Sequence, residues 1–187
     1  MEAATPTATA ITPGSYERDP IHSSVTFTVR HFGAGKFRGG FEDFDASLEV
    51  GDDGSLVIEG TVKVDSVQVR EPRLAGHLKS PDFFDVERYP EISFKSTSVN
   101  AADDGTLEIE GDLTIKGTTK NVSATGELTY TADDGHGNER AGVELSTTID
   151  RTEFGVDFKA ELPGGVAAVA DEVTLTAELE LVKAKAE

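Results

Sequence analysis

Apolar and polar residues alternate along most of the chain. Between Ser24 and Val29, the residues Val25, Phe27 and Val29 fall on one face, and the intervening positions are Ser and Thr. A period of two residues is typical of a β-strand buried on one face. No apolar stripe of helical period lasts beyond three turns, so the pattern predicts a chain that is nearly all β. Further alternating segments begin near Phe41, Leu56, Ile92, Leu107, Val122, Val143 and Val173.

Turn signals separate these segments. The tripeptide Asp-Asp-Gly lies at the start of both copies of an internal repeat, 52–64 and 103–115, and occurs again at 133–135. Its glycine can take the positive φ that a tight hairpin requires. Both copies also place a glycine, Gly60 or Gly111, on the apolar face of the strand, where it permits a bend or leaves space. The repeat has two explanations, duplication and convergent hairpin chemistry.

The alternation stops between residues 73 and 90. Leu74 and Leu78 have helical spacing, and Ser80 followed by Pro81 is typical of a helix start. This segment therefore predicts one or two short helices.

Together these signals predict an all-β fold, an elongated antiparallel eight-stranded barrel. Strands of about ten residues are roughly 34 Å long, and sequential hairpins of such strands commonly close into a barrel. A barrel of this size is filled by side chains or holds one small ligand. Because the inward candidates are mostly Val, Leu, Ile, Ala and Gly, with no Trp, we expect an apolar cavity for a long, nearly neutral molecule. The alternative is a cavity filled by the helical segment with Phe83 and Phe84.

The composition of the chain restricts the classes of partner and site that we expect. The chain has 17 Lys and Arg against 35 Asp and Glu, a net charge of −18, which disfavours nucleic acids and anionic membrane surfaces. It has no Cys, which excludes disulfides, thiolate metal sites and Cys nucleophiles. No segment is apolar over 18 residues, so stable membrane insertion is not expected.

Catalytic and metal-binding motifs are weak. The histidines are His22, His31, His77 and His136. On a continuous strand His22 and His31 would face opposite ways, so we expect no metal site. No Gly-x-Ser-x-Gly elbow of a serine hydrolase is present, and we expect no catalytic residue. His31 and His77 are candidates for hydrogen bonds to a ligand head group, although the commoner role of such histidines is structural.

The first residues are rich in Ala, Thr and Pro and carry little apolar surface. We expect residues 1–14 to form a disordered arm and residues 15–187 to form the barrel domain. The N-terminus lacks the basic and apolar regions of a secretory signal, which predicts a cytoplasmic protein.

Several motifs resemble one known family. They are His-Ser-x-Val-x-Phe-x-Val-x-His at 22–31, the block His-Leu-Lys-Ser-Pro-Asp-Phe-Phe-Asp-Val-Glu-Arg-Tyr-Pro within 77–96, Gly-x-Leu-Thr-Ile-Lys-Gly within 111–122, Arg-x-x-Phe-Gly at 151–155 and Asp-Glu-Val at 171–173. The chain resembles the YceI-like proteins across most of its length, and the middle block is highly specific.

The resemblance implies a lipocalin-like barrel that holds a polyisoprenoid or another long amphiphilic chain, often as a homodimer. The sequence departs from the family pattern at two places. Leu74 and Ala75 stand where many members have Arg-Asp, and Tyr16 and Phe158 stand where Trp is frequent. The contact made by the Arg-Asp pair is therefore in doubt here.

The expected function is non-catalytic binding of a long-chain lipid, most simply a polyisoprenoid or isoprenoid quinone, with no other cofactor. Two alternatives remain: a lipid isomerase or cyclase that uses His77 as acid or base, and a structural barrel without ligand. The residues expected to contact the lipid are Val25, Phe27, Val29, His31, Ile58, Val62, His77, Phe83, Phe84, Ile92, Phe94, Leu113, Ile115 and Leu145.

Overall fold

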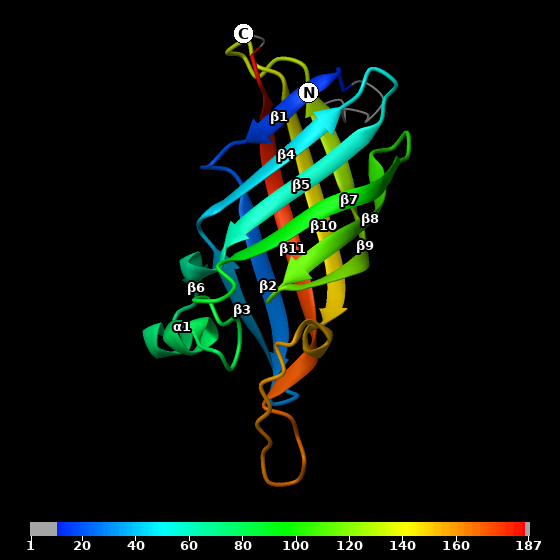
Figure 1. The fold of residues 1–187 in the computed structure, drawn as a ribbon. Helices are drawn as coiled ribbons and strands as arrows, with labels where there is room; N and C mark the ends of the chain where they lie inside the picture. The colour runs from blue at the N-terminus through cyan, green and yellow to red at the C-terminus, as the bar shows by residue number, and fades with distance from the viewer. Residues whose placement is uncertain (1–10, 186–187) are drawn as a thin grey trace.

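Eight antiparallel strands form a closed ring in the computed structural model, which describes residues 11–185 (Figure 1). Each strand pairs with the next, and the first pairs with the last, so the ring has no free edge. The predicted eight-stranded barrel is therefore confirmed. In ring order the strands are β1 (Gly14–Arg18), β4 (Phe44–Val50), β5 (Leu56–Lys63), β7 (Glu91–Ala101), β8 (Thr106–Ile115), β9 (Thr118–Thr131), β10 (Arg140–Asp150) and β11 (Val169–Lys183).

Three further strands extend the wall at one end of the barrel. β2 (Ser24–His31) follows β1 after a bend and pairs with β11. β3 (Gly35–Phe41) pairs with β2 and with the short β6 (Val67–Gln68), and leads into β4. The early strands of the barrel are thus interrupted, and the sequence pattern did not predict the breaks.

Helical segments lie at this same end (Figure 1). They are the α-helix α1 (Pro72–Lys79) and the 3₁₀ helices η2 (Val64–Ser66) and η3 (Arg151–Phe154). None of the helices in residues 11–185 has the length and apolar character needed to cross a membrane.

The helix in the 73–90 segment exists, but its predicted start was wrong. Glu71 caps the N-terminus of α1 by accepting a hydrogen bond from the Leu74 N–H at 2.8 Å, and Pro72 occupies the first turn. Ser80 ends the helix instead of starting one, since its N–H and its hydroxyl both donate to the His77 carbonyl. The Ser-Pro pair therefore leads into turns.

The other end of the barrel carries the Asp-Asp-Gly turns. Gly54, Gly105 and Gly135 have φ values of 81°, 92° and 82°, so the predicted positive-φ glycines are confirmed. The barrel interior at this end is filled by its own side chains, each of which is almost fully buried. These side chains include Tyr16, Leu48, Leu107, Ile109, Leu128, Val143 and Leu181.

A polar network closes the packed end around the carboxylate of Glu139. The Tyr130 hydroxyl donates to it at 2.6 Å, the Thr12 hydroxyl donates to it, and the Lys183 ammonium lies 3.1 Å away. The hydrogen bonds from Thr12 and Tyr130 lower the pKa of Glu139 to about 2. The Tyr16 hydroxyl also reaches the carboxylate, so the network joins both ends of the described chain.

Thr12 belongs to the arm that the sequence predicted to be disordered. Because it joins this network and β1 already begins at Gly14, the barrel starts before the predicted boundary at residue 15. Residues 1–10 of the predicted arm lie outside the described residues.

Glu139→Gln removes the charge at the centre of the network and should destabilise the protein at neutral pH by about 1–2 kcal/mol. The pKa of Glu139 is lower in the folded chain than its ordinary 4.5. Its stabilising effect is therefore complete above about pH 5 and is lost as the pH falls from 4.5 toward 2. Urea unfolding across this range should show a smaller acid loss for Glu139→Gln. An identical pH dependence in both proteins would contradict the assignment.

Candidate functional site

A cavity of about 560 Å³ occupies the half of the barrel opposite the packed end. Strands β2 to β5 and β7 to β11 supply its walls, and α1 and η3 contribute from the end of the barrel. The volume lies within the usual range for small-molecule sites. The prediction of an interior space, and not a barrel filled by Phe83 and Phe84, is therefore correct for this half.

The predicted lining residues converge on this cavity. Strand alternation accounts for most of them, because every second side chain of a barrel strand points inward. Their contact with a ligand remains a prediction. The residues placed on the cavity wall are Val25, Phe27, Val29, His31, Ile58, Val62, His77, Phe83, Phe84, Ile92, Phe94, Leu113, Ile115 and Leu145.

Sequence reasoning missed part of the wall. Phe37 and Phe41 line the cavity from β3, and Phe158 lines it from the segment after η3. A signal for β3 was present, since Phe37, Gly39 and Phe41 alternate with polar or small residues, but the glycines obscured it. The inward face of β11 adds Val173, Leu175 and Ala177.

The two glycines on the apolar faces have different consequences. A Cβ on Gly60 would meet only the Asp45 carbonyl oxygen, at 3.5 Å, so this glycine leaves space inside the cavity. A Cβ on Gly111 would lie 2.3 Å from the Phe94 ring, so that space is already filled. Only Gly60 therefore adds volume to the site.

Aromatic rings surround His77 at the cavity. The His77 ring meets Phe83 and Phe158 edge to face, with centroids 5.0 and 5.1 Å away. Its Nε2 lies 3.0 Å from an Asp82 oxygen, and the side chain is partly exposed. His31 is also exposed and also lines the cavity. The two predicted polar residues therefore lie where the cavity meets solvent.

Arg151 is the buried charged side chain of the cavity wall. Its guanidinium donates to the carbonyls of Val156, Val169 and Ala170 and to the Asp171 carboxylate. These bonds tie η3 to the start of β11. Within residues 11–185, every buried side-chain nitrogen and oxygen has a hydrogen-bond partner, so the wall presents no unpaired buried side-chain polar atom to a ligand.

The family model of the YceI-like domain matches residues 16–181 of this chain. The chain belongs to the YceI-like family. Among its curated relatives, a UPF0312 protein of Pseudomonas putida is 31% identical, with 90% of this chain and 85% of that protein covered. A UPF0312 protein of Staphylococcus aureus is 29% identical, with coverages of 87% and 94%.

Solved structures share the fold. Burkholderia cenocepacia BcnA has a TM-score of 0.70 at 22% identity, covering 89% of this chain and 99% of that one. A Campylobacter jejuni YCEI protein has a TM-score of 0.68 at 24% identity, with coverages of 79% and 85%. A polyisoprenoid binding domain from Saccharophagus degradans, implicated in plant cell wall breakdown, has a TM-score of 0.66 at 11% identity, with coverages of 91% and 98%.

The structure shows what replaces the Arg-Asp pair expected from the family pattern. Leu74, at the Arg position, lies in α1 and lines the cavity. Ala75, at the Asp position, is partly buried in the same helix. In this chain the helix therefore contributes the apolar side chain of Leu74 to the cavity wall.

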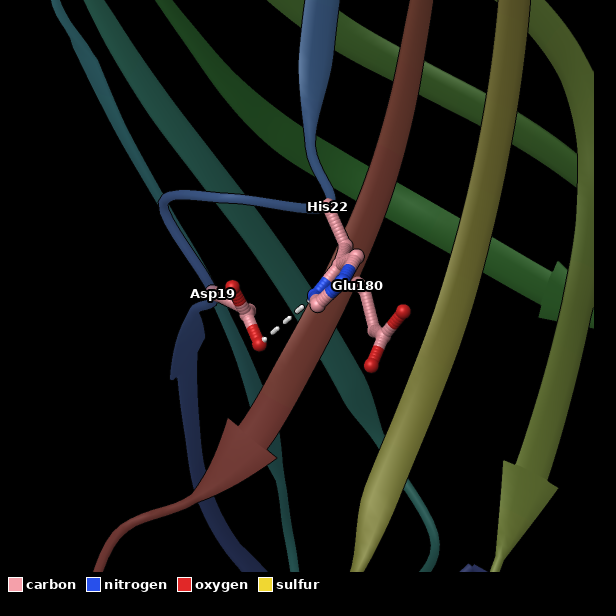
Figure 2. A group of neighbouring side chains, drawn as sticks. All are labelled: Asp19, His22 and Glu180. Carbon is pink, nitrogen blue, oxygen red and sulfur yellow. Dashed lines mark hydrogen bonds and ion pairs between the residues drawn. The ribbon is translucent and has the colours of Figure 1, made fainter.

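A separate group of acidic and histidine side chains lies outside the cavity. Figure 2 shows Asp19 and His22, from the bend between β1 and β2, beside Glu180 of β11. Arg140 donates to both carboxylates, at 2.9 Å to Asp19. The pKa of Asp19 is lowered, first by a hydrogen bond from the Ile21 N–H and then by Arg140. The geometry is that of an ion-pair network in which Arg140 supplies the positive charge.

Replacing Arg151 tests its role in supporting the cavity wall. Arg151→Ala removes the donor to the buried Val156 carbonyl and to the partly buried carbonyls of Val169 and Ala170, and should lower the free energy of unfolding by about 2–3 kcal/mol. Amide hydrogen exchange should accelerate in residues 155–171. The matched control is Arg73→Ala, because Arg73 is exposed on α1, and it should change stability by less than about 0.5 kcal/mol. Equal effects of the two substitutions would refute the structural role.

Proposed function

We propose that this barrel binds and carries one long, nearly uncharged lipid chain and performs no reaction on it. The observation that carries the proposal is the apolar cavity of about 560 Å³, whose buried side-chain nitrogens and oxygens, within the described residues, all have hydrogen-bond partners in the protein. A charged or strongly polar ligand would lose its hydration there without compensating hydrogen bonds. A hydrocarbon chain has no favourable hydration to lose when it enters the cavity.

Apolar burial supplies enough free energy for such a complex. Each buried methylene contributes about 0.8 kcal/mol, so about ten of them would contribute roughly 8 kcal/mol before ordering costs. A net free energy of that size would correspond to a dissociation constant of about 1 μM, so the ordering costs make the complex of a ten-carbon chain weaker than this. A longer or branched chain could offset the ordering costs and still bind.

We propose a polyisoprenoid as the class of lipid. The domain from Saccharophagus degradans is described as polyisoprenoid-binding, and it shares this fold. The branched methyls of such a chain suit a wall of aromatic and β-branched side chains, such as Phe27, Phe84 and Val173. The polar end of the molecule would lie near His31 and His77, where the cavity meets solvent.

Organic extraction of the purified protein, followed by mass spectrometry, tests the function directly. Native mass spectra should show an added mass that disappears after extraction, and the extract should contain a hydrophobic molecule. A protein that is empty as purified, and that also fails to bind an added isoprenoid quinone, would overturn the proposal.

A substitution that fills the cavity gives a second test. Gly60→Val places a side chain in the open space beside the Asp45 carbonyl without removing a contact. Thermal stability should be unchanged or higher, because glycine weakens a strand interior. Binding of an isoprenoid quinone should fall several-fold.

The matched control is Ser98→Val, which adds a similar side chain to the exposed outer surface of β7. It should leave quinone binding unchanged. If Gly60→Val binds as well as the wild type, the lipid does not occupy this part of the cavity.

A further inference from the structure

Large apolar side chains gather on the surface at the cavity end of the barrel. Phe32, Leu162 and Val166 are 41%, 40% and 44% exposed. They lie on two loops, the β2–β3 turn and the 155–168 loop, which projects beyond the barrel (Figure 1). Within the described residues, the other strongly exposed large apolar side chain is Ile21, at the bend between β1 and β2.

The two loops form one surface, which we call the tip and define as residues 30–36 and 159–168. The Phe32 N–H donates to the Ala168 carbonyl at 3.0 Å, and the Leu162 N–H donates to the Val166 carbonyl at 2.9 Å. A Cβ on Gly33 would lie 3.7 Å from a Val166 methyl group. The loops that carry the exposed apolar side chains are therefore in contact, and grouped apolar side chains on a surface are a feature of interaction sites.

Phe32 occupies a backbone conformation that does not suit it. Its φ is +51°, that of Gly33 is +65°, and the Ala34 N–H donates to the His31 carbonyl at 3.1 Å. Asn, Asp and Gly are the residues preferred at such turn positions, and a bulky aromatic residue is strained there. The Phe32 ring packs against the His31 ring, with centroids 4.0 Å apart, and the residue is still 41% exposed. Strained residues of this kind cluster at functional sites, and the exposed part of the Phe32 ring is available to a partner outside the chain.

Charge is distributed unevenly along the barrel. The β2–β3 hairpin, residues 24–41, contains Arg30, Lys36 and Arg38 and no acidic residue, in a chain with 35 of them. Lys159 adds a cation from the other loop, although Asp157 and Glu161 flank it. The acidic Asp-Asp-Gly turns lie at the opposite end. The tip therefore carries Arg30, Lys36 and Lys159 against Glu161, while Asp171 and Glu172 lie just outside it near the start of β11. This local excess of positive charge favours an anionic surface.

We propose that the tip docks on an anionic lipid bilayer. Phe32, Leu162 and Val166 enter the headgroup region, while Arg30 and Lys36 meet the lipid phosphates. This inference rests on the proposed function and extends it, since cargo would move between the bilayer and the cavity at this end. Tip residues His31, Ala160 and Ala168 themselves line the cavity. The local charge, not the net charge, then decides the partner.

Vesicle flotation with the full chain tests the proposal. The probes are vesicles of phosphatidylcholine alone and of equal parts phosphatidylcholine and phosphatidylglycerol. The wild type should bind the anionic vesicles several-fold more than the neutral ones, and added salt should reduce the difference. Vesicle binding is measured whether or not the cavity is loaded, so its failure is distinct from an empty cavity, which extraction detects.

The informative variant is Phe32→Asn. Asn suits the turn, so the variant should fold with equal or greater stability, yet vesicle binding should fall by about tenfold. The control is Ile21→Asn, which removes an 82% exposed apolar side chain away from the tip and should bind as the wild type does. Three results would overturn the proposal: a wild type that binds neither vesicle, Phe32→Asn that binds as well as the wild type, or Ile21→Asn that loses as much.

Discussion

A short seam closes the barrel and determines how it is filled. β1 meets β11 through only three residue pairs, from Tyr16 opposite Lys183 to Arg18 opposite Leu181. Beyond the seam the chain bends, and β2 takes the place of β1 beside β11, from Ser24 opposite Glu178 onward. β11 therefore serves both halves of the barrel. Because β11 is hydrogen-bonded first to β1 and then to β2, the barrel wall is continuous from the packed end to the cavity end.

One end of the barrel is packed and contributes stability, and the other end contains the cavity. At the seam, Tyr16 and Leu181 are fully buried, and the network around Glu139 connects residues from both ends of the described chain. At the other end, side chains such as Val25 and Leu175 pack against the core but are only partly buried. A fully packed barrel would have more buried area and no site. The cavity lowers the stability of the barrel through lost packing, and the well-packed end provides enough stability to tolerate that loss.

Charge is also distributed unevenly between the two ends of the barrel. The net charge of −18 argues against anionic partners when it is treated as one number. The three Asp-Asp-Gly turns of the packed end carry six of the 35 acidic residues, while the β2–β3 hairpin carries only cations among its Lys, Arg, Asp and Glu residues. Since screening restricts electrostatic interactions to roughly 8–10 Å in physiological salt, the local charge at the tip matters more than the sum.

The sequence by itself determined the strands and the residues that face inward. A period of two residues gives each strand an apolar face, and closure of the sheet turns those faces toward one axis, so Phe27 and Leu113 could be placed on the wall without coordinates. The sequence was less informative where glycines interrupt the period, as in the strand with Phe37. It also misled where Ser80 and Pro81 resemble a helix start.

Only the tertiary structure decided which inward residues surround empty space. Leu107 and Leu113 lie on the same face of β8, yet the first is buried in the packed end and the second lines the cavity. Their local sequences cannot distinguish them, because the difference depends on what the facing strands supply. The partners of Arg151 and the meeting of Phe32 with Ala168 are of the same kind. Each arises from contacts between segments that the chain brings together only when the barrel closes.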